Sequence, residues 1–136
     1  MTTIPTSSID AAALRQAFSD KDADALLAFY ADDAEWLEYQ PDRPLAEPKR
    51  YAGRAEIRAY LEHIAGEPEP LAVSDELADG DRAAFAVWMS FADGRRFGEH
   101  CILTLRDGLI VRHVDVELWD PRPHADSERD RATLTQ

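Results

Sequence analysis

The most regularly patterned part of the chain runs from residue 79 to residue 119 and reads DGDRAAFAVWMSFADGRRFGEHCILTLRDGLIVRHVDVELW. Three Asp-Gly pairs divide it, at Asp79-Gly80, Asp93-Gly94 and Asp107-Gly108. Such a pair between apolar alternating runs predicts a tight β-hairpin, because the turn needs residues that tolerate positive φ. With the apolar run that starts at Leu71, the pattern predicts an antiparallel meander of strands at about 71–78, 82–92, 95–106 and 109–119.

The chain before this meander has a helical period instead. Apolar residues recur at helical spacing over 9–18, after a capping signature that ends at Asp10. Asp22 is expected to cap a second helix, and a third is expected to end near residue 66. A short strand is expected at 34–39. The sequence therefore predicts an α+β domain in which three helices pack on one curved sheet.

Composition limits the classes of partner. The chain has 136 residues, 45% of them hydrophobic, and a formal net charge of −12. That length favours one domain, expected at 1–120, followed by a polar and poorly ordered tail at 121–136. The acidic surface argues against nucleic acid or an anionic membrane as partners, because both would repel it.

Cysteine and histidine usage gives no sign of a metal or a disulfide. The chain has one cysteine, Cys101, and four scattered histidines, a pattern without zinc-site spacing. We expect no metal and no cofactor. The longest apolar run, 83–89, is too short to cross a bilayer, and the N-terminus lacks a signal-peptide pattern, so the expected location is the cytoplasm.

Four motifs, in this order and spacing, resemble the nuclear transport factor 2-like superfamily, and within it the SnoaL-like and ketosteroid isomerase-like proteins. They are LLAFYADDA at 26–34, GRAEIR at 53–58, AAFAV at 83–87 and DGLIVRH at 107–113. The resemblance covers about residues 7–120. It implies a cone in which a strongly bent, mixed but mainly antiparallel sheet wraps three helices and encloses a pocket. It leaves the chemistry open, since members include enzymes and purely associative modules.

The last predicted strand carries the main candidate site. His113, Asp115 and Glu117 alternate onto one face, together with Leu109, Val111 and Trp119. The opposite face carries Ile110, Arg112, Val114, Val116 and Leu118. Alternation alone allows either face to be the core. The resemblance places the His113 face in the pocket and the apolar face against a second copy, which predicts a homodimer.

These residue types suit acid–base chemistry near neutral pH. Asp115 is the first candidate base or acid, His113 its partner and Glu38 a second carboxylate, because close carboxylates in a dry pocket have raised pKa values. Glu38 has an equally simple interpretation as a solvated charge at a strand edge. The expected ligand contacts are Trp36, Glu117, Leu14 and Trp88, although the tryptophans also suit a core.

One departure from the ketosteroid isomerases limits the reaction. The positions that match their two hydrogen-bond donors to the enolate are Leu14 and Cys101, and neither side chain is a strong donor. Steroid isomerisation by that mechanism is therefore not expected. The sequence leaves two hypotheses. One is a cofactor-free enzyme for isomerisation, cyclisation, dehydration or hydration of a small hydrophobic molecule, and the other is a non-catalytic ligand-binding or dimerisation module.

Overall fold

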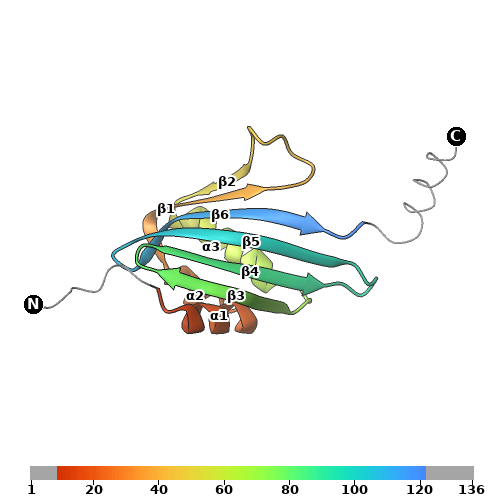
Figure 1. Ribbon diagram of the computed structural model, residues 1–136, viewed down its shortest axis with the longest axis horizontal. Coiled ribbons are helices and arrows are strands. Elements are labelled where there is room, and N and C mark those ends of the chain that lie inside the picture. The colour runs from red at the N-terminus through yellow and green to blue at the C-terminus, as the bar shows by residue number, and fades with distance from the viewer. Residues whose placement is uncertain (1–8, 122–136) are drawn as a thin grey trace, which may run out of the picture.

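The computed structural model describes residues 9–121, which form three helices and one six-stranded sheet (Figure 1). The elements follow the chain as α1 (Ala11–Asp20), α2 (Ala23–Leu27), β1 (Tyr30–Tyr39), β2 (Lys49–Ala52), α3 (Gly53–Ala65), β3 (Leu71–Asp79), β4 (Arg82–Ser90), β5 (Arg96–Arg106) and β6 (Leu109–Trp119). The predicted α+β class is confirmed. The expected tail lies, except for Pro121, outside the described residues.

The sheet has the strand order β2-β1-β6-β5-β4-β3. All neighbours are antiparallel except β1 and β6, which run parallel, so the sheet is mixed but mainly antiparallel. Helix α3 packs against β1 and β2, behind the sheet in Figure 1, and α1 packs against β3. This is the cone that the family resemblance implied.

The turns and caps form where their residue types favour them. At the last hairpin, Asp107 and Gly108 have φ of 53° and 79°, the conformation that an Asp-Gly turn requires. The side chains of Asp10 and Asp22 accept hydrogen bonds from the backbone N–H of the third residue after each, both at 3.0 Å. The cap at Asp22 is therefore as predicted. At the first helix Asp10 is itself the cap, whereas the sequence pattern had placed it three residues after a cap at Ser7, which lies outside the described residues.

The prediction was wrong at the start of β1 and at β2. The strand β1 begins at Tyr30 rather than at residue 34, because Tyr30 pairs with Ile110 of β6 instead of extending α2. The strand β2, which pairs with β1, was not predicted. Its four residues, Lys49–Ala52, have no apolar alternation to reveal them.

An irregularity in the β5–β6 pairing also changes which residues face the core. Leu105 pairs with Ile110 while Thr104 pairs with Arg112, so Val111 is an extra residue in β6. Ile110 and His113, three positions apart, are therefore both buried. Uninterrupted alternation had placed them on opposite faces.

The helices and the sheet bury a hydrophobic core. The largest buried side chains there come from all three helices and from the sheet, and they include Leu14, Phe18, Leu26, Ile57, Leu61, Phe85 and Leu103. The rings of Phe18 and Phe85 lie 5.3 Å apart. No helix among the described residues is long and apolar enough to span a membrane.

Candidate functional site

A cavity of about 720 Å³ lies between α3 and the concave side of the sheet. Its wall is largely aromatic, with contributions from Phe18, Trp36, Tyr51, Tyr60, Phe91, Phe97 and Trp119. The polar groups of the wall include Glu38, Glu99, His113 and Glu117 on β1, β5 and β6, and others lie on or next to β2 and α3. The cavity therefore combines apolar walls with a few convergent polar groups, as small-molecule sites do.

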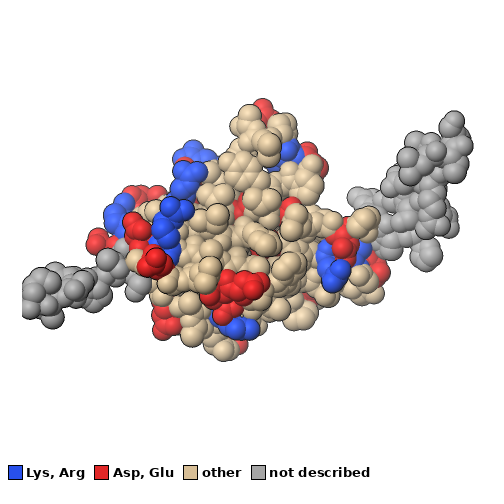
Figure 2. Space-filling model, viewed as in Figure 1, with Lys and Arg blue, Asp and Glu red and all other residues tan. Residues whose placement is uncertain are grey.

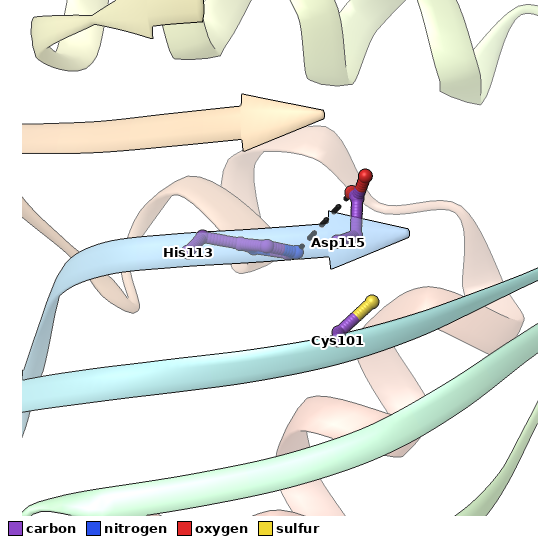
Figure 3. A group of neighbouring side chains, drawn as sticks. All are labelled: Cys101, His113 and Asp115. Atoms are coloured by element: carbon purple, nitrogen blue, oxygen red, sulfur yellow. Dashed lines mark ion pairs between the residues drawn. The ribbon is translucent and has the colours of Figure 1, made fainter. Parts of the chain in front are cut away.

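His113 is held from both sides. The Tyr30 hydroxyl lies 2.9 Å from Nδ1, and Trp36 stacks on the imidazole with ring centroids 3.8 Å apart. The Nε2 atom lies 3.5 Å from Oδ2 of Asp115, which in turn accepts a hydrogen bond of 2.8 Å from Nε1 of Trp36. Figure 3 shows His113 and Asp115 on β6, with Cys101 on the neighbouring strand β5.

Strand pairing explains why residues from distant parts of the sequence meet here. Trp36 pairs with His113 and Glu38 with Asp115 across the parallel β1–β6 boundary. Glu99 of β5 pairs in the same way with Glu117 of β6. Side chains on one face of adjacent paired strands are neighbours, so these pairings bring the four carboxyl groups together.

The four carboxyl groups form a tight cluster, in which one oxygen of each lies within 4.8 Å of the others. Glu38, Glu99 and Asp115 are 1%, 8% and 0% exposed. Gln40 bridges two of the groups, donating from Nε2 to Glu38 at 3.2 Å and to Glu117 at 3.1 Å. Oε1 of Glu38, Oε2 of Glu99 and Oδ1 of Asp115 are buried without a hydrogen-bond partner.

Burial raises the pKa values of Glu38 and Glu99. Desolvation, with the Asp115 charge second, raises the pKa of Glu38 to about 8. The same two causes raise the pKa of Glu99 well above its usual range. The Glu38 carboxyl can therefore gain or lose a proton near neutral pH. Burial likewise raises the pKa of Cys101, so this residue is a thiol rather than a thiolate nucleophile.

Two sets of side chains have the spacing to hold a metal ion. One is the four-carboxyl cluster, and the other is Cys101, His113 and Asp115, whose ligand atoms also lie within 4.8 Å of one another. Cysteine and histidine spacing in the sequence gave no sign of either set. Carboxylate oxygens alone suit hard cations such as Mg²⁺ or Ca²⁺.

The structure brings together most, but not all, of the expected site residues. Trp36, Glu38, His113 and Glu117 line the cavity. Asp115 is fully buried next to the wall, beneath Trp36 and His113.

Leu14 and Trp88, two of the expected ligand contacts, do not line this cavity. Leu14 is buried in the core, next to Phe85 and Val73. Trp88 is 40% exposed on the outer face of β4, where its ring covers Gly98, and a Cβ at Gly98 would lie 2.6 Å from that ring. Alternation along β4 turns Trp88 away from the cavity, because its neighbours Val87 and Met89 face inward.

Several cavity residues were missed by the sequence reasoning. Tyr60 follows Ile57 by three positions on α3, so the helical period was a usable signal for it. Tyr51 lies on the unpredicted strand β2. Tyr30, which does not line the cavity but lies 2.9 Å from Nδ1 of His113, was expected on the second helix. Gln40 carried no pattern at all. Its role as a bridge between carboxylates depends on the parallel pairing of β1 with β6.

This cone with a cavity at its sheet defines the nuclear transport factor 2-like superfamily. The SnoaL-like domain model matches residues 11–113, and the chain belongs to the SnoaL-like domain family. A search of curated proteins finds no match.

Solved structures of similar fold come from several bacteria. A Kribbella flavida protein whose name proposes a ketosteroid isomerase is 25% identical, with a TM-score of 0.61 over 86% of this chain and 82% of its own. An NTF2-like protein of unknown function from Mesorhizobium loti is 23% identical, with a TM-score of 0.67 over 77% and 84%. Another from Burkholderia xenovorans is 24% identical, with a TM-score of 0.61 over 88% and 87%. The last two likenesses are of fold alone.

Proposed function

We propose that the protein binds a small hydrophobic molecule in its cavity and moves a proton to or from that molecule without a cofactor. One observation carries the proposal: Oε1 of Glu38 is buried at the wall of an aromatic cavity without a hydrogen-bond partner. A free carboxyl oxygen in such surroundings is available to exchange a proton with a bound molecule. General acid–base catalysis requires such a group within reach of the substrate.

Glu38 is the group that exchanges the proton. With its pKa raised to about 8 by burial, its carboxyl is mostly protonated at neutral pH and its ionised fraction is a stronger base than an ordinary carboxylate. Gln40 holds Oε2 through a hydrogen bond of 3.2 Å, which leaves Oε1 to face the ligand. Both protonation states are thus accessible in the working pH range.

His113 and Asp115 form a second proton-transfer unit. Asp115 acts through His113, because it is fully buried and Nε2 of the ring lies 3.5 Å from its Oδ2. The Tyr30 hydroxyl can donate to Nδ1 or accept from it, so it serves either protonation state of the ring. In this proposal Asp115 is a positioning residue rather than the base itself.

A generic probe of proton abstraction tests the proposal. 5-Nitrobenzisoxazole opens to a coloured phenolate when a base removes its ring C–H proton. The protein should accelerate this reaction over buffer, with kcat/KM rising through pH 8 as Glu38 ionises. Glu38→Gln should lower kcat/KM by about 100-fold or more, whereas Glu47→Gln, at an exposed loop position, should not. Equal rates in both variants would refute the role of Glu38.

The outer face of the sheet supports the homodimer as a further part of the proposal. Ile102, Val116 and Leu118 are about half exposed there. Figure 2 shows mostly uncharged side chains over the middle of β5 and β6, with charged groups toward the ends. A chain of net charge −12 repels its own copies except through a surface without carboxylates. A second copy is therefore the partner that this face suits, with or without catalysis in the cavity.

A further inference from the structure

We propose that the ligand of the cavity carries a protonated primary or secondary amine, which the carboxyl groups of Glu38 and Glu99 bind while its apolar part packs on the aromatic wall. This inference rests on the proposed function for the existence of a ligand, and it adds the ligand's charge and chemical class.

The charged side chains of the cavity wall favour a cationic ligand. Five glutamates line the cavity, Glu38, Glu56, Glu67, Glu99 and Glu117. Among the described lining residues, Lys49 is the one lysine and there is no arginine. The Lys49 ammonium lies 5.5 Å from the centre of the Tyr51 ring, and none of its contacts is an ion pair with these carboxylates. Glu38 is mostly protonated in the free protein and releases its proton when an ammonium group binds beside it, because a neighbouring positive charge favours the carboxylate. An anionic ligand would instead meet more carboxyl groups than cationic ones.

The unpaired carboxyl oxygens of Glu38 and Glu99 favour a ligand that carries N–H donors. Oε1 of Glu38 and Oε2 of Glu99 are buried without partners, and their side chains belong to the cluster whose oxygens lie within 4.8 Å of one another. A buried acceptor without a donor is costly, so a ligand that supplies donors to both is stabilised. An ammonium group offers two or three N–H donors together with the positive charge that carboxylates favour.

The internal cation does not satisfy this pair of oxygens. His113 is a positively chargeable group at the cluster, and its Nε2 lies 3.5 Å from Oδ2 of Asp115. Oδ2 of Asp115 accepts a hydrogen bond from Trp36, whereas Nε2 of His113 and Oδ1 of Asp115 are both buried without a hydrogen-bond partner among the described residues. Glu117 accepts hydrogen bonds from the side chains of Gln40 and Trp119. Glu38 and Glu99 also each keep a buried oxygen without a partner in the described part of the chain and, unlike Asp115, they line the cavity, so a ligand can reach them.

The aromatic wall favours an organic cation over a metal ion. A metal ion coordinated by the cluster would leave most of the 720 Å³ cavity, and seven aromatic side chains, without a role. Aromatic faces attract ammonium groups and cover the apolar carbon atoms attached to them. An amine with a hydrophobic body uses both features of the cavity at once.

Three probes with one ring system and different charges test the inference by isothermal titration calorimetry at pH 7. They are 1-naphthylmethylamine, which is cationic, 1-naphthalenemethanol, which is neutral, and 1-naphthoate, which is anionic. The amine should bind at least about tenfold more tightly than the alcohol, and the carboxylate should bind most weakly. Glu99→Gln should reduce the amine affinity by about tenfold and leave the alcohol affinity unchanged, and Glu47→Gln should change neither.

The outcomes separate this inference from the proposed function. Alcohol that binds as tightly as the amine, in a protein that still opens 5-nitrobenzisoxazole, would refute the cationic ligand and leave the proposed function intact. Failure of all three probes to bind would refute both. Mn²⁺ that displaces the amine at micromolar concentration would assign the cluster to a metal and overturn the inference. An amine preference that survives in Glu99→Gln would refute the role of Glu99.

Discussion

An ordinary half-buried strand buries its apolar face and exposes its polar face, but β6 does the reverse. The inward face carries His113 and Asp115, which are 1% and 0% exposed. The outward face carries Val116 and Leu118, which are 47% and 51% exposed. Charged groups are rarely buried unless they are paired, and apolar strand residues normally face the core. Both faces of this strand therefore break the common rule.

The difference teaches that each face is incomplete without something else. Burying unpaired polar groups costs free energy, so the inner face is retained because it does something that a purely apolar core would not. Exposed apolar side chains gathered on one sheet face mark an interaction surface. In the proposed function the inner face binds a ligand and exchanges protons with it, and the outer face packs against a second copy. The predictions below test the two halves of this contrast in turn.

The largest difference in stability is expected between two alanine variants, one at Trp36 on the inner face of the sheet and one at Trp88 on its outer face. Trp36 is 1% exposed, stacks on His113 and donates to Asp115. Trp36→Ala should lower the free energy of unfolding by about 3–5 kcal/mol, since it opens a cavity and leaves a buried carboxylate without its donor. Trp88→Ala, on the outer face, should cost about 1 kcal/mol. Urea denaturation at fixed protein concentration measures both.

Trp36→Phe separates the two causes. It keeps an aromatic ring against His113 but removes the N–H that donates to Asp115. A cost close to that of Trp36→Ala would show that the hydrogen bond dominates, and a small cost would show that packing does. If Trp36→Ala and Trp88→Ala were equally destabilising, the contrast between the faces would be wrong.

Most of the fold could be predicted from the sequence because its signals are local. Asp-Gly turns, aspartate caps and hydrophobic periods act within a few residues, and they gave three helices and the meander. The errors fall where tertiary pairing overrides local preference. Tyr30 joins β1 because Ile110 offers it a partner, and 49–52 becomes a strand because β1 lies beside it.

The site was harder to predict because its geometry depends on non-local register. Glu38 and Asp115 are 77 positions apart in the chain and become neighbours only through the parallel β1–β6 pairing. Nothing local in the sequence specifies that register, nor the extra residue in β6 that turns Ile110 inward. Strand alternation grouped His113, Asp115 and Glu117, but the resemblance chose the direction in which they point.

The second prediction concerns the inner face and the pH dependence of stability. The Glu38 carboxyl titrates at its ordinary 4.5 when unfolded and at about 8 when folded, so the folded chain binds more protons between these values. The stabilising contribution is therefore complete below pH 4.5 and is lost as the pH rises through 8. From pH 5 to pH 7 the free energy of unfolding should fall by about 2–3 kcal/mol from this group. Glu99 acts in the same direction.

Glu38→Gln is the matched test of this slope. Because glutamine binds no proton, the variant should show a flatter decline of stability with pH than the wild type and should be the more stable of the two at pH 8. Glu47→Gln should keep the wild-type slope. Chemical denaturation from pH 5 to pH 9 gives the three curves. Parallel curves for wild type and Glu38→Gln would refute the burial of an unpaired carboxyl at this position.

The smallest effect on folding, and the sharpest test of the outer face, is expected for Leu118→Glu. Leu118 is 51% exposed, so a charge there should change the stability of the isolated chain by less than about 0.5 kcal/mol. The same charge placed within an apolar contact between two copies would be desolvated against its own counterpart, which should convert dimer to monomer in sedimentation at micromolar concentration. Leu45→Glu, at a leucine that is 79% exposed in the loop before β2, adds the same charge away from the sheet and should leave the dimer intact. A wild-type chain that sediments as a monomer would refute the homodimer, and the two faces of β6 would then have to be explained separately.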